Sequence, residues 1–335
     1  MIRRSTAIAG AAALAFLFLP LSNALAQQQV PAAPPQDAPA ASPDQPSAPA
    51  PKAPVFPKPD PANFTASAPS PDAVNTFLQT SWGYDDSRIW QVQAVLKTPV
   101  EGISKVIVYV GDKSGKMKPT ALLFFALPDG KHIIAGDEIV PFGEHPFAEY
   151  RAQLQQRADG PYRGTASKEL ELVEFADFQC PHCKEAQANM EKLAVDFPKA
   201  RIVFQGYPLE KIHPASRTAA SYGVCVTKQG GSNAFFQFVS AVFDGQDGLA
   251  TADGATMTLN SAVTKAGLDP AKTAVCAATP ETKAVVDASV KLAQDLNIQQ
   301  VPTLMVNGRN VPANAPYETI KQIVAYQAKQ DGVAQ

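Results

Sequence analysis

The chain has 335 residues and carries 29 Lys+Arg against 31 Asp+Glu, a formal net charge of −2. No basic block or stripe accompanies this near-neutral balance, which argues against a nucleic-acid partner. Four cysteines are far too few for a disulfide scaffold in a chain of this length, so they must have local roles.

Residues 1–26 have the pattern of a signal peptide. Two arginines supply a positive start, Ala7–Leu21 is apolar, and Ala24-Leu25-Ala26 has the form of a cleavage site. The alternative is a retained N-terminal anchor. The apolar run is shorter than the roughly 20 residues that a membrane span needs, which favours the signal peptide. We therefore expect export to the periplasm, where disulfides persist.

Residues 27–70 are dominated by proline and alanine, and twelve of the thirty prolines fall between Pro31 and Pro61. Such a segment has few backbone donors and few side chains that could form a core. It predicts a disordered linker with polyproline-like character.

Residues 71–144 have the pattern of a small α+β domain. A short helix is expected over Asp72–Trp82, and residues 145–165 are expected to form a connecting helix, His145–Arg157, and a linker. Between the two helices the sequence predicts an antiparallel sheet from four runs rich in β-forming residues, namely Arg88–Lys97, Lys105–Gly111, Ala121–Leu127 and His132–Val140.

The sequence pattern of residues 166–330 predicts a second domain, of the α/β class. It consists of a β-α-β unit, then a group of helices, then a β-β-α unit. Asn307-Gly308 is a strong hairpin signal between the last two strands. The expected strands are Glu169–Phe175, Arg201–Tyr207, Thr303–Val306 and Asn310–Pro312. The expected helices are Pro181–Val195, Pro214–Thr227, Asn233–Phe243, Thr258–Ala266, Pro270–Ala277, Thr282–Leu296 and Tyr317–Ala328.

The sequence Cys-Pro-His-Cys at residues 180–183 stands between the first of these strands and a helix. In that setting the Cys180 sulfur lies where unpaired N–H groups and the helix dipole favour negative charge. Pro181 suits the first helical turn because it has no N–H to leave unpaired. His182 can add positive charge or a hydrogen bond to the thiolate, and Cys183, one turn in, is the resolving thiol. The motif predicts redox chemistry.

Two other interpretations fit this motif less well. A structural disulfide across two intervening residues would be strained and therefore labile. A zinc site needs two more ligands, and Cys225 and Cys276 are not spaced as a second half-site. We therefore expect neither a metal nor a cofactor.

Residues 173–183, Val-Glu-Phe-Ala-Asp-Phe-Gln-Cys-Pro-His-Cys, resemble the active-site strand and turn of the DsbA family of disulfide oxidases. The similarity extends over most of residues 168–330, including His213-Pro214 and Leu296–Thr303. It implies a thioredoxin-like fold with an inserted helical subdomain. It also implies disulfide exchange with exported proteins that contain cysteines, and a membrane redox partner that recycles the active site.

The resemblance also assigns roles to residues outside the Cys-Pro-His-Cys motif. Glu174 matches a buried acid beneath the disulfide that moves the proton of Cys183, and its pKa should be raised by burial. Val301 and Pro302 match a dipeptide with a cis peptide bond that faces the disulfide and pairs with the substrate chain. The alternative is that Glu174 is a partly exposed acid at the end of the strand.

Cys225 and Cys276 match a second cysteine pair that forms a structural bridge in some DsbA-like proteins, the alternative being two buried free thiols. Neither has a strand-to-helix setting, so neither is a catalytic candidate. His132, His145 and His213 show no ligand spacing and are interpreted as structural.

Residues 129–136, Asp-Gly-Lys-His-Ile-Ile-Ala-Gly, resemble a stretch of the N-terminal dimerisation domain of the DsbC and DsbG disulfide isomerases. The similarity covers about residues 70–158 and implies a cystatin-like domain and a homodimer. The active-site residues nevertheless favour an oxidase, because they touch the sulfurs. A dimeric isomerase or reductase is the alternative, and a periplasmic chaperone with an incidental cysteine pair is the third hypothesis.

Overall fold

The structure is a computed structural model that describes residues 54–333. The expected signal peptide and the linker as far as residue 53 lie outside the described residues. The chain divides into two compact units between Glu144 and His145. Within residues 54–333, no helix combines the length and the apolar character needed to span a membrane.

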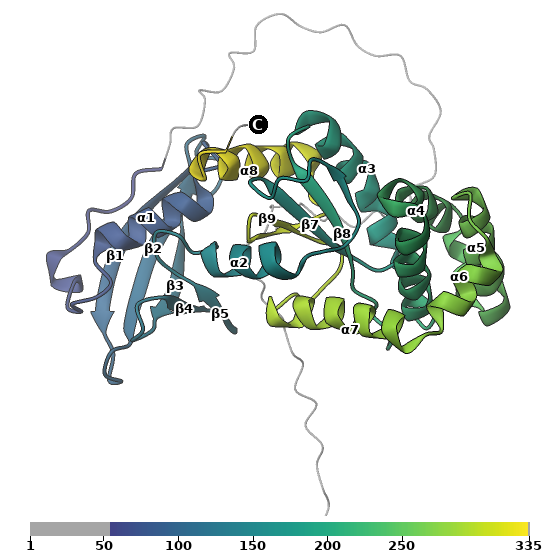
Figure 1. Cartoon of the computed structure of the whole chain (residues 1–335). Helices are drawn as coiled ribbons and strands as arrows, with labels where there is room; N and C mark the ends of the chain where they lie inside the picture. The colour runs from purple at the N-terminus through teal and green to yellow at the C-terminus, as the bar shows by residue number, and fades with distance from the viewer. Residues whose placement is uncertain (1–53, 334–335) are drawn as a thin grey trace, which may run out of the picture. The chain divides into compact units, whose positions relative to one another are not determined.

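The N-terminal unit is a small α+β domain (Figure 1). Its first helix is capped by Ser70, whose hydroxyl accepts a hydrogen bond from the N–H of Ala73, and has proline at its first position. Val74 and Phe77 of this helix pack with Val106 and Val108 of the sheet in one core. The α+β class with an antiparallel sheet is confirmed. The elements are α1 (Pro71–Trp82), β1 (Arg88–Lys97), β2 (Ser104–Asp112), β3 (Thr120–Ala126), β4 (His132–Ala135) and β5 (Glu138–Pro141), with the strands in chain order across the sheet.

Two features of this unit differ from the sequence-based expectation. The run expected as one strand over His132–Val140 is the β4–β5 hairpin, because Gly136 adopts a positive φ of 65° and allows a two-residue turn. The predicted linker is also shorter than expected. Phe64 and Ala66 pack against the core of this unit, and the N–H of Ala66 donates to the carbonyl of Val95 at 3.0 Å. These contacts join residues 64–66 to the sheet of this unit.

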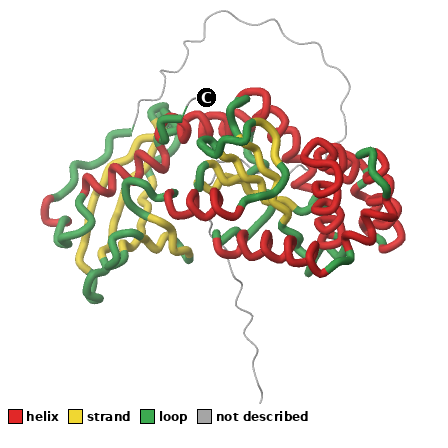
Figure 2. The backbone as a smooth tube through the Cα atoms, in the orientation of Figure 1, coloured by secondary structure: helices red, strands yellow, loops and turns green. Residues whose placement is uncertain are grey.

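The C-terminal unit has a five-stranded sheet in the order β10-β9-β7-β8-β6, and Figure 2 shows its strands between helices. The central strand β7 (Glu171–Ala176) is buried at all six positions. It runs parallel to β8 (Arg201–Gly206) and antiparallel to β9 (Thr303–Val306). The edge strands are β6 (Tyr162–Gly164), which was not predicted because three residues carry too little pattern, and β10 (Arg309–Pro312).

Helices cover both faces of this sheet (Figure 1). Two of them, α2 and α7, share a core with Val173, Val203 and Met305 on one face. The opposite face lies under α3 and α8. This is the thioredoxin-like α/β architecture that the sequence predicted. The four helices are α2 (Ala148–Arg157), α3 (Pro181–Asp196), α7 (Pro280–Asp295) and α8 (Tyr317–Gln330).

The inserted helical subdomain consists of α4 (Ser216–Asp244), η2 (Gln246–Ala250), α5 (Ala252–Lys265) and α6 (Pro270–Ala277). The two helices expected within residues 214–243 are the two arms of α4, which are separated by the non-helical residue Gly231 (φ 72°, ψ −171°). Only glycine adopts such a backbone conformation without strain. The subdomain core includes Phe178 and the cysteines of the 180–183 motif, so it packs directly against that motif.

Candidate active site

Cys180 stands at the junction of the central strand and α3. The strand ends at Ala176, and Cys180 is the N-cap residue of α3 with an extended backbone (φ −79°, ψ 120°). Pro181 occupies the first helical position, and the carbonyl of Cys180 accepts hydrogen bonds from the N–H groups of Cys183 (3.1 Å) and Lys184 (3.3 Å). The sulfur therefore sits at the positive end of a helix of 16 residues.

The two thiols of the motif differ in accessibility and acidity. Both are free in this structure, with 6% of Cys180 and 0% of Cys183 exposed to solvent. The pKa of Cys180 is lowered to about 6, chiefly by a hydrogen bond from the Cys183 thiol and further by the N–H groups of Cys183 and His182. The same hydrogen bond and burial raise the pKa of Cys183. Cys180 is thus the thiol that ionises more readily, while Cys183 keeps its proton.

Polar contacts fix the turn that carries these sulfurs. The buried Gln246 amide donates to the carbonyls of Phe178 (2.9 Å) and Cys180 (3.0 Å), and the N–H of Asp177 contacts the Cys183 sulfur at 3.4 Å. Across from the turn, the carbonyl of Val301 lies 3.9 Å from the Cys180 sulfur.

Val301 and Pro302 are joined by a cis peptide bond immediately before β9. The structure therefore brings Val301 to the reactive sulfur, as the resemblance implied.

Glu174 lies beneath the motif on β7 and is 3% exposed. Burial raises its pKa to about 7, against a smaller opposing effect of its hydrogen bond with Gln187. The amide of Gln187 donates to Glu174 Oε1 at 2.8 Å and to the carbonyl of Cys183 at 3.2 Å, so it links the acid to the helix that carries the resolving thiol. A carboxyl with such a pKa can both accept and release a proton near neutral pH.

The two histidines near the motif both have carboxylate partners. The side chain of His182 is 66% exposed, and its Nδ1 is 2.9 Å from Glu185 Oε2, a hydrogen bond that raises the pKa of His182. His213, which was interpreted as structural, instead places its Nδ1 2.9 Å from Oδ2 of the buried Asp177. Its charge is among the causes that lower the pKa of Cys180.

Three side chains around the sulfurs were not identified from the sequence. Gln187 follows Cys183 by four residues on one helix, so helical spacing could have indicated it. Asp177 follows the buried strand immediately, and a polar residue in that position is a weak signal. Gln246 is more than 60 residues from the motif, and nothing local predicts its contact.

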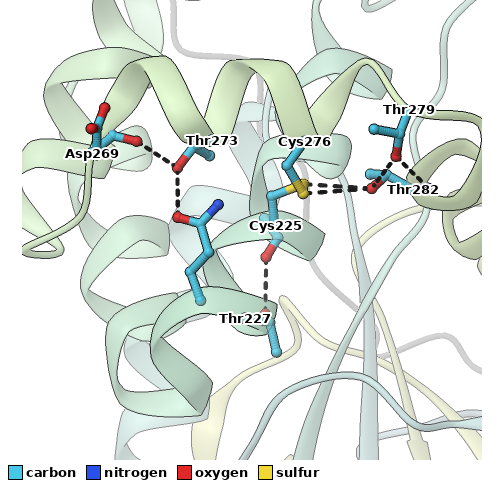
Figure 3. Close-up of a disulfide and its surroundings, with 9 residues drawn as sticks. Cys225, Thr227, Asp269, Thr273, Cys276, Thr279 and Thr282 are labelled. Atoms are coloured by element: carbon cyan, nitrogen blue, oxygen red, sulfur yellow. Dashed lines mark hydrogen bonds between the residues drawn. A yellow bond between two sulfur atoms is a disulfide. The ribbon is translucent and has the colours of Figure 1, made fainter.

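The other two cysteines form a disulfide between α4 and α6. The Cys225 and Cys276 sulfurs are 2.06 Å apart, and their Cα atoms are 6.0 Å apart. Figure 3 shows the hydroxyl of Thr282 beside both sulfurs, at 3.5 Å from Cys225 and 3.8 Å from Cys276. In the part of the chain that the structure describes, no group of three or more His, Cys, Asp or Glu side chains could hold a metal ion.

Two curated proteins of bacterial origin are similar to part of this chain. The Na(+)/H(+) antiporter NhaA 3 of Salinispora tropica is 34% identical over 91 residues, which is 27% of this chain and 14% of the antiporter. The Na(+)/H(+) antiporter NhaA 1 of Mycolicibacterium vanbaalenii is 27% identical over 169 residues, 50% of this chain and 26% of the antiporter. The chain thus spans about a quarter or less of the length of these relatives.

Two solved structures are also similar. A thioredoxin-like oxidoreductase from Silicibacter pomeroyi is 25% identical, with a TM-score of 0.45 over 53% of this chain and 98% of that chain. The thiol-disulfide exchange protein α-DsbA2 from Wolbachia pipientis is 19% identical, with a TM-score of 0.45 over 53% of this chain and 95% of that chain.

The family comparison covers the unit that carries the motif. The family model described as thioredoxin matches residues 156–325, half of the 335-residue chain. The matched range contains β7, α3, the inserted helices and β9, and it therefore includes both sulfurs and the residues that surround them. The chain belongs to the thioredoxin family.

Proposed function

We propose that this protein is a thiol–disulfide oxidoreductase that donates its Cys180–Cys183 disulfide to cysteine pairs of exported proteins. The observation that carries the proposal is the asymmetry of the two thiols. Cys180, at the N-terminus of α3, has a pKa of about 6, whereas the pKa of the buried Cys183 is raised. The periplasmic location and the recycling of the site by a membrane redox partner belong to the same proposal.

The reaction balances in two exchange steps. A substrate thiolate attacks Cys180 Sγ of the oxidised protein, the Cys180–Cys183 bond breaks, and Cys183 leaves with the electron pair and takes a proton, which Glu174 can supply. A second substrate thiolate then attacks the substrate sulfur of the mixed disulfide and releases Cys180 as a thiolate. The substrate loses two electrons to form its disulfide, and the protein becomes the dithiol.

The acidity of Cys180 favours the oxidising direction. A thiol of pKa about 6 is about nine-tenths ionised at pH 7, whereas an ordinary thiol of pKa about 8.5 is ionised to about 3%. This difference stabilises the dithiol by about 1.4 kcal/mol at pH 7, which raises the reduction potential by about 30 mV. The contribution has the sign that an oxidase needs, and it is moderate in size.

The N-terminal unit favours a second candidate, a dimeric isomerase or reductase of the DsbC and DsbG kind. The family model match begins at residue 156, so it gives this resemblance no support, and it stays a prediction. The observation behind it is the sheet of this unit, on which the large apolar side chains of Leu123 (44%) and Ile139 (58%) are exposed. Single apolar side chains are also common on the surfaces of monomers, so this candidate depends on the resemblance of residues 129–136 and on its own test.

A titration against glutathione redox buffers tests the main proposal. We expect a reduction potential above the roughly −270 mV of thioredoxin and below the roughly −120 mV of DsbA. A potential at or below that of thioredoxin would contradict the oxidising direction. Rapid rescue of scrambled ribonuclease by a particle of dimer size would favour the isomerase instead. Full activity of Cys180→Ser in cells would favour a chaperone.

A further inference from the structure

Two histidines are close enough in sequence or space to influence the Cys180 sulfur. His182 lies inside the motif, but its imidazole is 66% exposed and is hydrogen-bonded to Glu185, which is equally exposed at 67%. A charge that is paired with a carboxylate and surrounded by solvent acts only weakly on a neighbouring group. The side chain of His213 is 17% exposed and comes from the segment between β8 and α4.

His213 is held by a carboxylate that belongs to the active-site turn. The Asp177 side chain is fully buried, and its two oxygens accept three hydrogen bonds. The N–H of Gln179 donates to Oδ1 at 2.8 Å, and the N–H of Leu209 (2.7 Å) and Nδ1 of His213 (2.9 Å) donate to Oδ2. Asp177 also donates its own N–H to the Cys183 sulfur at 3.4 Å. One residue therefore touches the resolving thiol and orients the imidazole.

This contact fixes the orientation of the His213 imidazole. A carboxylate accepts but does not donate, so Nδ1 carries a hydrogen and points at Asp177. As a cation, His213 would occupy a mostly enclosed position, held by Asp177 in the turn that carries Cys180, a residue that is itself only 6% exposed. Water screens such a pair much less than it screens the exposed pair of His182 and Glu185.

We infer that Asp177 and His213 form a positioning pair for the reactive sulfur, in which Asp177 orients the imidazole and the His213 cation stabilises the Cys180 thiolate. The inference rests on the proposed function, and it assigns to His213 the electrostatic role that the sequence assigned to His182. The lowered pKa of Cys180, to which His213 contributes, supports it.

Arg217, four residues beyond His213, already has two carboxylate partners. Arg217, in the first turn of α4, forms ion pairs with Glu210 and with Asp287 of α7, the latter at 2.7 Å. The titratable and charged groups on the turn, the start of α3, the segment of His213 and the start of α4, together with the α7 partner of Arg217, are Asp177, Cys180, His182, Cys183, Lys184, Glu185, Glu210, Lys211, Arg217 and Asp287.

The test is the pH dependence of iodoacetamide alkylation of Cys180 in the reduced full chain. Variants His213→Gln and His213→Lys separate loss of the charge from loss of the side chain. We expect His213→Gln to raise the midpoint of the profile by at least half a pH unit, roughly a threefold loss of thiolate below the midpoint. His213→Lys should keep the midpoint near the wild-type value. Asp177→Asn should behave as His213→Gln does, and His182→Ala should shift the midpoint less than His213→Gln.

His132 supplies a matched control, since its Nδ1 is 2.6 Å from Asp129 in the N-terminal unit, and His132→Ala should leave the profile unchanged. The rates above pH 9 and the melting temperature of each variant show whether the sulfur and the fold are intact. An unchanged midpoint in folded His213→Gln, or a larger shift in His182→Ala, overturns the inference. If either of these outcomes occurs and the wild type still equilibrates with glutathione, only the inference fails and the proposed function stands. If the wild type does not equilibrate with glutathione, the proposed function itself fails.

Discussion

The two cysteine pairs of the C-terminal unit share one hydrophobic core but have opposite chemistry. Cys180, Cys183 and Cys225 belong to the same cluster of buried side chains, and Cys276 packs against it. The first pair is present as thiols, whereas Cys225 and Cys276 are joined by a disulfide. Burial in an apolar core therefore does not decide what a cysteine does here.

The difference lies in the backbone around each sulfur. Cys180 caps α3, where N–H groups have no helical partner and can point at a thiolate. Cys225 lies within α4, whose N–H groups there are used by the helix, and Cys276 is next to the last residue of α6, at the negative end of the helix dipole. The position of a cysteine relative to a helix N-terminus thus separates the reactive pair from the structural one.

The largest expected effect comes from removing the reactive sulfur. Cys180→Ser should lower the rate of disulfide exchange with a reduced peptide by at least about a thousandfold, because no other described thiol has a lowered pKa. The double variant Cys225→Ala/Cys276→Ala should keep the rate within about twofold of the wild type, since neither sulfur takes part in the steps proposed above. A loss in the double variant as large as in Cys180→Ser would remove the distinction between the pairs.

The structural pair should matter for stability. Its disulfide closes a loop with a sequence separation of 51, which the chain-entropy model values at about 4 kcal/mol. Cys225→Ala/Cys276→Ala should therefore lower the free energy of unfolding by about 2–4 kcal/mol in urea titrations. Reduction of the wild type followed by alkylation is the matched comparison. A loss below about 1 kcal/mol would mean that the helices hold together without the bond.

A third prediction concerns the acid beneath the reactive pair. Because the pKa of Glu174 is raised to about 7 in the folded protein, the folded state binds this proton more tightly than the unfolded state. Its contribution is most favourable below the ordinary pKa of glutamate and is lost as the pH rises through 7. Glu174→Gln should therefore gain stability relative to the wild type by about 2 kcal/mol between pH 5 and pH 8.

Urea titrations of the two proteins at several pH values measure this change, and Glu149→Gln, at an exposed position of α2, is the matched control. A pH-independent difference between Glu174→Gln and the wild type would show that the carboxyl titrates normally. Glu174→Gln should also slow the release of Cys183 from the disulfide, because the glutamine cannot transfer a proton.

The local part of the site could be predicted from the sequence, whereas the long-range part could not. The strand, the Cys-Pro-His-Cys turn and α3 are consecutive in the chain. The spacing of apolar residues, the helix cap and the position of the proline therefore all predict the same strand-to-helix turn. The role of Glu174 as a buried acid was predicted from the family resemblance. The roles of Gln246 and His213 depend on segments that fold back onto the turn from 66 and 36 residues away along the chain. No local sequence pattern predicts such contacts.

The same reasoning accounts for the differences in the fold. The three residues of β6 are too few to show alternation, and they are defined by pairing with β8. Phe64, in the proline-rich segment, is ordered by packing that composition alone does not reveal.

The smallest expected effect is at the hydroxyl beside the structural disulfide. Thr282 is buried, its hydroxyl contacts both sulfurs of that pair and accepts a hydrogen bond from Thr279, and Thr279 itself caps α7. Thr282→Val keeps the shape and the cap, so it should cost about 1 kcal/mol of stability, measured by urea titration. The alkylation profile of Cys180 should not move, because a disulfide has no thiolate to stabilise and the substituted side chain touches neither reactive sulfur. A shifted profile would mean that the shared core couples the two pairs, and the helix terminus would then be only part of what separates their chemistry.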